Sequence, residues 1–122
     1  MKLITAIVRR ETLDGLIPTL VETGAHGLTV SEVKGFGRQY GQLFVASEVA
    51  GLGRRDGQSE RQVALLPKVR LDLVVEDSDV DDLVQALLKS AESGAIGDGK
   101  VWVSPLDNVI RVRTGETGRA AV

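Results

Sequence analysis

The segment of the chain best suited to chemistry ends in Gly97, Asp98, Gly99 and Lys100. Glycines permit a tight turn whose backbone N–H groups point together, and such a turn binds phosphate oxygens. A lysine that follows the turn adds a positive charge. A plain glycine turn between a helix and a strand is the alternative interpretation. The segment is not the P-loop of nucleoside triphosphatases, because it lacks the Gly-Lys-Ser/Thr ending.

A second glycine cluster, Gly35 and Gly37, precedes Arg38 and Gln39. The guanidinium group of Arg38 suits a phosphate, with which arginine forms paired hydrogen bonds. The side-chain amide of Gln39 could coordinate a metal ion or bind a carboxylate. The alternative is that a strand ends here and the chain enters a solvated loop.

Two more guanidinium groups, those of Arg111 and Arg113, are separated by one residue. Side chains alternate between the two faces of an extended segment, so both groups would point to the same side and suit a polyphosphate. A solvated strand face is the alternative. Three clusters of this kind in one chain favour a phosphate-bearing ligand over three unrelated turns.

Composition excludes several other kinds of chemistry. The 122 residues include no cysteine and one histidine, His26, which excludes disulfides, thiolate catalysis and zinc sites built from cysteines or several histidines. No Ser/His/Asp arrangement can be assembled, so we expect a protein that is not an enzyme. The net charge of −2 gives no basic excess for direct nucleic-acid binding. No apolar run approaches the ~20 residues of a membrane span, so we expect a cytoplasmic protein without membrane insertion.

Hydrophobic periodicity predicts the elements that must position these clusters. Apolar or alternating patterns predict strands over residues 3–8, 28–36, 68–75, 100–105 and 108–113. We expect the strand over residues 28–36 to bury one face. Helical spacing of apolar residues predicts one helix after Thr12 and another after Ser78, each with that residue as its N-cap. We expect Pro18 to kink the first helix or delay its start, and Gly94 to end the second.

The predicted order of elements, β-α-β-β-α-β, is the ferredoxin-like plan. It places two helices on one face of a four-stranded antiparallel sheet, an α+β sandwich, in one domain over residues 1–122 with a short tail over residues 114–122. A long loop over about residues 37–66 joins the second and third strands, and loops of this length are functional or disordered. The chain has no third helix to cover the other face of the sheet, so we expect self-association.

Four segments of the chain together resemble the PII nitrogen-regulatory signal proteins: residues 29–39, 66–70, 94–103 and 110–116. The resemblance extends over both ends of the chain and excludes only the middle of the long loop. It implies a homotrimer of ferredoxin-like subunits, in which ATP and ADP compete for three clefts between neighbouring subunits. With MgATP bound, 2-oxoglutarate binds beside it. The long loop, called the T-loop, then alters its contact with a transporter, an enzyme or a transcription factor.

The resemblance also implies roles for individual residues. Those implied to bind the nucleotide are Thr29, Gly35, Gly37, Arg38, Gln39, Val74, Gly97, Asp98, Gly99, Lys100, Arg111 and Arg113. Among them, Thr29 and Val74 would line the adenine pocket, and the last two arginines would reach the phosphates from across the subunit interface. Gln39 would help to hold Mg²⁺ and 2-oxoglutarate, and Lys68 would pair with a carboxylate of 2-oxoglutarate.

The T-loop departs from the family pattern. Between Gln39 and Pro67 the chain is longer than typical members by about ten residues. The usual tyrosine-rich tip is absent, and the one tyrosine, Tyr40, lies at the base of the loop. The resemblance therefore does not extend to nucleotidylylation, and it implies a divergent paralogue with its own partner.

Other functions are compatible with parts of the sequence. A slow ATPase could use the same clefts, but it would need a positioned base, and Lys100 and Gln39 are the polar side chains that the clefts offer near the phosphates. A PII-like sensor of another metabolite, linked to bicarbonate or to metal stress, could regulate a transporter, although Gln39 and Lys68 favour 2-oxoglutarate. An RNA-binding module would need exposed aromatic side chains on the sheet, and aromatics make up 3% of the chain.

Overall fold

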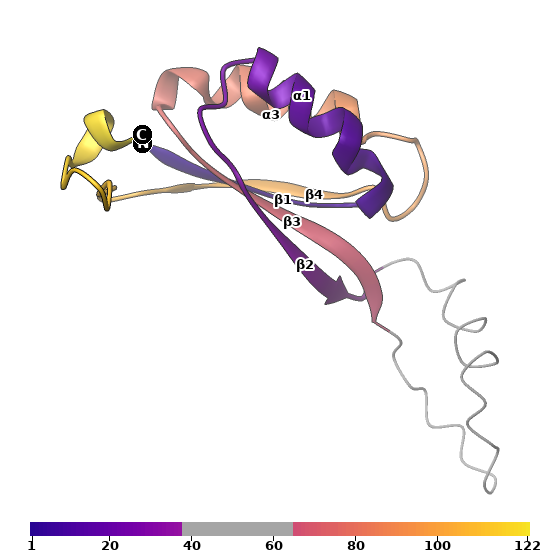
Figure 1. Ribbon diagram of the computed structural model, residues 1–122. Coiled ribbons are helices and arrows are strands. Elements are labelled where there is room, and N and C mark those ends of the chain that lie inside the picture. Colours follow the sequence, from indigo (N-terminus) through magenta and orange to yellow (C-terminus); the bar gives the residue numbers. More distant parts are fainter. Residues whose placement is uncertain (38–64) are drawn as a thin grey trace, which may run out of the picture.

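The computed structural model describes residues 1–37 and 65–122, and Figure 1 shows how their elements are arranged. The strands are β1 (Lys2–Val8), β2 (Thr29–Gly35), β3 (Leu66–Val75) and β4 (Gly99–Pro105). The helices are α1 (Leu13–Glu22) and α3 (Val80–Ala91). Short 3-10 turns are η1 (Arg10–Thr12), η3 (Asp77–Asp79) and η4 (Gly118–Ala121). Residues 38–64, which include most of the predicted T-loop, lie outside the described residues.

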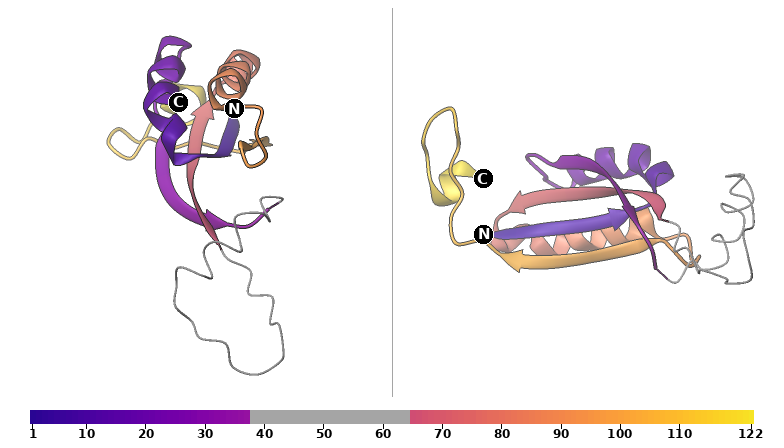
Figure 2. Two further views of the ribbon diagram at one scale, coloured as in Figure 1. Left: turned by 90° about the vertical axis from the view of Figure 1, so that its right-hand side faces the viewer. Right: turned by 90° about the horizontal axis from the view of Figure 1, so that it is seen from below.

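The four strands form one antiparallel sheet in the order β2-β3-β1-β4. Both helices pack on one face of this sheet, and the view from below in Figure 2 shows the opposite face without a helix. This is the ferredoxin-like α+β sandwich that the periodicity predicted. Within residues 1–37 and 65–122, no helix has the length and apolar character needed to cross a membrane.

Alternation along the two central strands builds the core between the sheet and the helices. Ile4, Ala6 and Val8 of β1 point toward the helices, and each is 0–1% exposed. Residues of β3 and of the two helices complete the buried cluster: Val69, Leu71, Leu73, Val75, Leu16, Leu20, Leu83, Leu87 and Ala91. Burying a leucine or isoleucine side chain contributes roughly 1.5–3 kcal/mol, so this cluster holds the helices on the sheet.

Both helices begin through a 3-10 turn. Thr12 occupies the predicted N-cap position of α1 but makes no side-chain cap hydrogen bond, whereas Asp79 and not Ser78 is the N-cap of α3. Thr12 has a helical backbone conformation, and its hydroxyl donates to the carbonyl of Arg9 at 2.7 Å. Ser78 lies inside η3, and its hydroxyl donates to the carboxylate of Asp79 at 2.9 Å. Short hydroxyl side chains readily bond to neighbouring groups of their own turn, which leaves them unable to cap the helix that follows.

The first helix starts at Leu13 and continues through Pro18, so the delayed start, one of the two predicted effects of Pro18, is wrong, and the kink stays a prediction. A proline at this position leaves the carbonyl of Asp14 without its helical donor. Both Pro18 and Asp14 are exposed, so water can bond that carbonyl. The second helix ends at Ala91, before the predicted stop at Gly94, because the backbone of Glu92 is already extended.

The prediction that the second strand buries one face is wrong for the single chain. β2 is exposed along most of its length, and 40% of Val30 is accessible. It is an edge strand of the sheet, and Figure 1 shows it running out from beneath the helices. Proteins commonly cover an exposed edge with another element or chain, which is the role that the expected self-association would fill.

Residues 108–113 form part of a hairpin instead of the predicted fifth strand. One β-bridge closes this hairpin, and the N–H of Gly115 donates to the carbonyl of Arg111 at 2.8 Å. Positive φ angles at Gly115 (70°) and Gly118 (64°) turn the chain, and glycine adopts such angles without strain. Arg111 and Arg113 therefore do not share one strand face, because Arg113 lies in the turn.

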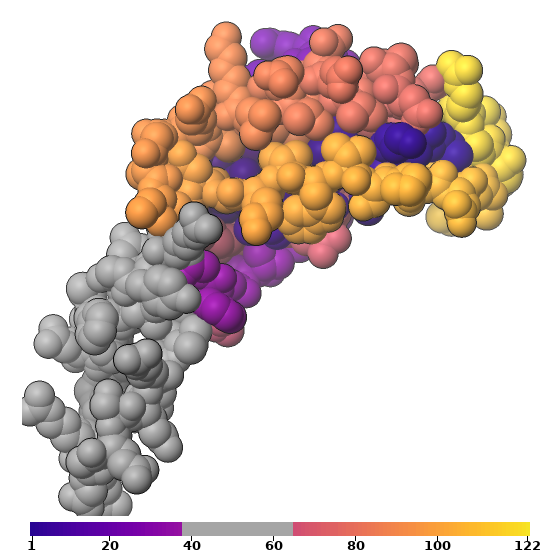
Figure 3. All heavy atoms as spheres, turned by 180° about the vertical axis from the view of Figure 1, so that it is seen from behind, coloured from indigo at the N-terminus to yellow at the C-terminus, as the bar shows by residue number. Residues whose placement is uncertain are grey.

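The residues that follow the hairpin fold back against the end of the sheet. The guanidinium group of Arg119, in η4, forms an ion pair with Glu76 at 2.6 Å. The amino group of Met1 pairs with Asp77, next to Glu76, at 2.7 Å. Figure 3 shows these C-terminal residues at one end of β4, with the glycine segment at the other end.

Candidate functional site

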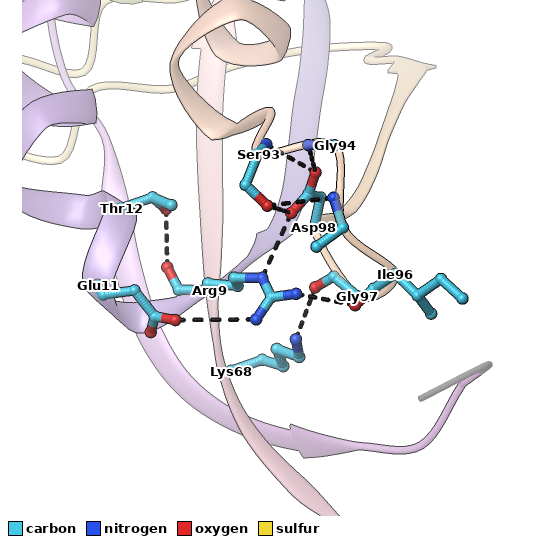
Figure 4. A network of polar contacts seen from close by, with 10 residues as sticks. Arg9, Glu11, Thr12, Lys68, Ser93, Gly94, Ile96, Gly97 and Asp98 are labelled. Carbon is cyan, nitrogen blue, oxygen red and sulfur yellow. Dashed lines mark hydrogen bonds and ion pairs between the residues drawn. The ribbon is translucent and has the colours of Figure 1, made fainter. Parts of the chain in front are cut away.

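The glycine segment is shaped by the carboxylate of Asp98, which points back into its own loop (Figure 4). This carboxylate accepts the backbone N–H groups of Ser93 at 2.8 Å and Gly94 at 3.0 Å, and it also accepts the hydroxyl of Ser93. The Ser93 hydroxyl, followed by the Ser93 N–H, holds the pKa of Asp98 below its usual range. The charge of Asp98 is thus compensated inside the loop, so it fixes the loop's shape without presenting a bare negative charge to an anion.

Two cations from neighbouring strands hold the same loop from the sheet side (Figure 4). Arg9, which directly follows β1, donates from Nε to Asp98 at 3.3 Å and from Nη2 to the carbonyl of Ile96 at 2.8 Å. Lys68 of β3 donates from Nζ to the carbonyl of Gly97 at 2.7 Å. Burial, followed by the nearby charge of Arg9, lowers the pKa of Lys68. Arg9 also pairs with Glu11 at 3.9 Å, so the two cations behind the loop are balanced by Glu11 and Asp98.

Arg9 is the residue of this site that sequence reasoning missed. The signal that could have found Arg9 is strand register, because Val8 pairs with both Val69 and Gly99. The next residue along β1 must then lie between Lys68 and Asp98.

Gly99 lets β4 begin in close contact with β1. Its φ of +118° belongs to the region that favours glycine, and a Cβ atom added there would lie 1.8 Å from the carbonyl oxygen of Ile7. No side chain fits at this distance, so the glycine is required by the backbone itself.

Lys100, next in β4, is among the residues that line a hollow, together with Asp98, Gly99, Val8 and Leu88. Its pairing with Ile7 places its side chain on the open face of the sheet. The hollow has a volume of about 340 Å³ and lies between α3 and the start of β4. Among the described residues, no hydrogen bond or ion pair engages the ammonium group of Lys100. This cation is therefore available to a ligand. We call residues 97–100, Arg9 and Lys68 the cradle.

A second group of expected site residues gathers elsewhere on the chain. Thr29, Val74 and Arg111 line a pocket of about 500 Å³. Arg111 is oriented within it, because its Nη1 pairs with Glu116 at 2.6 Å. Arg113 lies in the adjoining turn and makes no hydrogen bond or ion pair with any described residue. We call Thr29, Val74, Arg111 and Arg113 the pocket group.

The cradle and the pocket group lie at opposite ends of the sheet. Lys68 and Val74 are six residues apart on β3, which places them roughly 20 Å apart along the strand. Gly35 and Gly37 belong to the cradle end, because Gly35 pairs with Leu66 at the start of β3. The structure thus gathers the described residues of the expected site into two halves and does not unite these halves within one chain.

The donor set of the cradle fits a metal ion only as part of a metal–nucleotide complex. Mg²⁺ bound to a nucleotide takes most of its oxygens from phosphates and water, and one or two from protein. Within residues 1–37 and 65–122, no group of three or more carboxylate, histidine or cysteine side chains could hold a metal ion. The carboxylate of Asp98 is occupied by its own loop. Gln39, the expected Mg²⁺ ligand, lies outside the described residues, as does Arg38.

Comparison with known proteins identifies the family of the chain. The family described as Nitrogen regulatory protein P-II matches residues 1–116. Nitrogen regulatory protein P-II 2 of Methanothermobacter thermautotrophicus is 44% identical over 122 residues, covering 100% of this chain and 97% of the relative. The Nitrogen regulatory protein P-II of Microchaete diplosiphon and that of Synechocystis are each 43% identical, with both chains covered completely. This chain therefore belongs to the P-II family of nitrogen regulatory signal-transduction proteins.

Proposed function

We propose that this chain is a cytoplasmic, homotrimeric regulator that senses ATP or ADP and, together with Mg²⁺ and ATP, 2-oxoglutarate. It would pass this information through residues 37–66 to a partner protein, namely a transporter, an enzyme or a transcription factor. P-II proteins are regulators of other proteins, and their family relationship to this chain supports the general role. The ligands and the trimer are our proposal.

The single observation that carries the proposal is the division of the expected site into two halves. The cradle offers Lys100 and the loop of residues 97–100 at one end of the sheet, and the pocket group offers Arg111 at the other end. Neither half alone surrounds a nucleotide. A ring of three copies would place the cradle of one copy against the pocket group of the next, which completes three equivalent clefts.

Removing a cation from either half of the site is expected to weaken the binding of both nucleotides. Lys100→Ala in the cradle and Arg111→Ala in the pocket group should each reduce the affinity for ATP and for ADP by about tenfold or more, because a hydrogen bond to a charged group contributes roughly 1.5–3 kcal/mol. Titration calorimetry measures both affinities. Lys89→Ala is the control, since Lys89 is exposed in the last turn of α3 and should leave binding unchanged. Unchanged binding in both Lys100 and Arg111 variants would remove the proposed site.

The trimer is expected to form without any ligand. Apolar side chains lie exposed beside Arg111, with Ile110 60% and Val112 100% accessible, and Trp102 of the open sheet face is 41% accessible. Burying such surface between copies is favourable by about 25 cal/mol per Å². Light scattering at micromolar concentration should give three times the mass of one chain. A monomer under these conditions would contradict the proposed clefts.

The cradle does not favour the slow ATPase that the sequence left as an alternative. Hydrolysis needs a base that can orient and deprotonate water. The carboxylate of the cradle, that of Asp98, accepts hydrogen bonds from N–H groups of its own loop and from Arg9. Its oxygens are therefore committed to structure.

A further inference from the structure

The loop from Ser93 to Asp98 connects α3 to β4, and Asp98 gathers its two ends. The loop still has to be fixed relative to the sheet, because Lys100, Gly97 and Gly99 must contact one ligand together. From the contacts of Arg9 we infer that it is the positioning residue that fixes this loop to the sheet in the form that binds phosphate. The inference rests on the proposed nucleotide site, and it adds to that site a residue that would act through the loop.

The geometry of Arg9 suits this task. One guanidinium group reaches two points of the loop, the Asp98 carboxylate at 3.3 Å and the Ile96 carbonyl at 2.8 Å. The Arg9 side chain is 21% exposed, so the contacts are partly shielded from water. An arginine presents several donors in a rigid planar fork, whereas a lysine ammonium is a single point at the end of a flexible chain. A lysine at this position would keep the charge and lose the double contact.

Lys68 helps to hold the loop, but its contact is exchangeable. Its ammonium group donates to the neutral carbonyl of Gly97 at 2.7 Å. A carboxylate is a stronger acceptor for an ammonium group than a neutral carbonyl is, because it adds the attraction of opposite charges. A bound carboxylate would therefore draw Lys68 away from Gly97. Arg9 would then keep the loop in place, because its two contacts do not involve Lys68.

The test compares Arg9→Lys with the matched variant Arg10→Lys. Arg10 is the next residue, but it is 70% exposed and pairs with Glu32 at 3.1 Å, away from the loop. In the protein without nucleotide, Arg9→Lys should accelerate hydrogen exchange at the amides of Ser93 and Gly94 by about tenfold or more, with the midpoint of thermal unfolding unchanged. Arg10→Lys should leave this exchange unchanged. Affinity for ATP should fall by about tenfold in Arg9→Lys alone.

The exchange measurement separates this inference from the proposed function. If the unmodified protein bound no nucleotide, the proposed function would fail. The exchange rates would still show whether Arg9 fixes the loop to the sheet. Unchanged exchange at Ser93 and Gly94 in Arg9→Lys would overturn the inference, even if ATP bound less tightly. Equal acceleration in Arg10→Lys would overturn it as well. Asp98→Asn combined with Arg9→Lys should show a non-additive effect on exchange, because both residues act on one loop.

Discussion

Alanine in place of Gly99 is expected to destabilise the protein by roughly 2–5 kcal/mol and to abolish nucleotide binding. The left-handed backbone conformation costs a residue with a side chain about 1–2 kcal/mol, and overpacking a closely packed position costs about 1–3 kcal/mol. The added Cβ would meet the carbonyl oxygen of Ile7 at 1.8 Å. This oxygen belongs to the backbone of β1 and cannot rotate away, so the start of β4 must move. Urea-induced unfolding measures the loss of stability.

Gly94→Ala provides the matched control for this variant. Gly94 also has a positive φ, +77°, but a Cβ added there meets nothing within 4 Å. The free energy of unfolding of Gly94→Ala should therefore fall only by the cost of the positive φ angle, about 1–2 kcal/mol. Equal losses in the two variants would show that the approach of β4 to β1 is not what requires glycine.

2-Oxoglutarate is expected to bind only when MgATP is present, and Gln39→Ala or Lys68→Ala is expected to abolish its binding. A dicarboxylate beside a triphosphate is repelled unless positive charge separates the two. Mg²⁺ would supply that charge at the near carboxylate, with Gln39 as its protein ligand. Lys68 would neutralise the far carboxylate by leaving the carbonyl of Gly97, to which it donates at 2.7 Å. Because coupling is reciprocal, 2-oxoglutarate should tighten the binding of ATP by the same factor.

Calorimetric titration of 2-oxoglutarate in the presence of MgATP, and separately of ADP, checks this expectation. ADP lacks the γ-phosphate, so it should not support binding. Lys2→Ala is a suitable control, since Lys2 begins β1 at the far end of the sheet from Lys68. Binding that was equal with ADP, or absent with MgATP, would rule out 2-oxoglutarate as the ligand. A sensor of another metabolite, linked to bicarbonate or to metal stress, would then be the better candidate.

The sheet and its two helices could be predicted because their signals are periodic and local. Ile4, Ala6 and Val8 alternate along a strand, and Leu83 and Leu87 repeat at helical spacing, so each set identifies its own buried face. Apart from the burial of β2 and the start of α1, the errors lie where short turns decide the conformation. The 3-10 turns before the helices have no periodic sequence pattern, and the hairpin near the C-terminus has none either.

In the candidate site, too, the sequence could predict local features but not contacts between distant residues. Glycines before Lys100 predicted a tight turn, and positive φ angles at Gly94, Gly97 and Gly99 confirm it. That this turn binds phosphate stays a prediction. The sequence could not show that the carboxylate of Asp98 turns into its own loop, because that depends on the positions of the Ser93 and Gly94 N–H groups. It also could not show the contact of Arg9 with Asp98, because the two residues are 89 positions apart along the chain.

The separation of the cradle from the pocket group has a genetic consequence in the proposed trimer. A chain defective only in its cradle and a chain defective only in its pocket group would each be inactive alone. In a ring that mixes the two, one cleft always joins an intact cradle to an intact pocket group, so two null alleles would complement each other. A chain defective in both halves would behave in the opposite way. A single such copy would disable both of the clefts it borders, and the allele would be partly dominant over the normal gene.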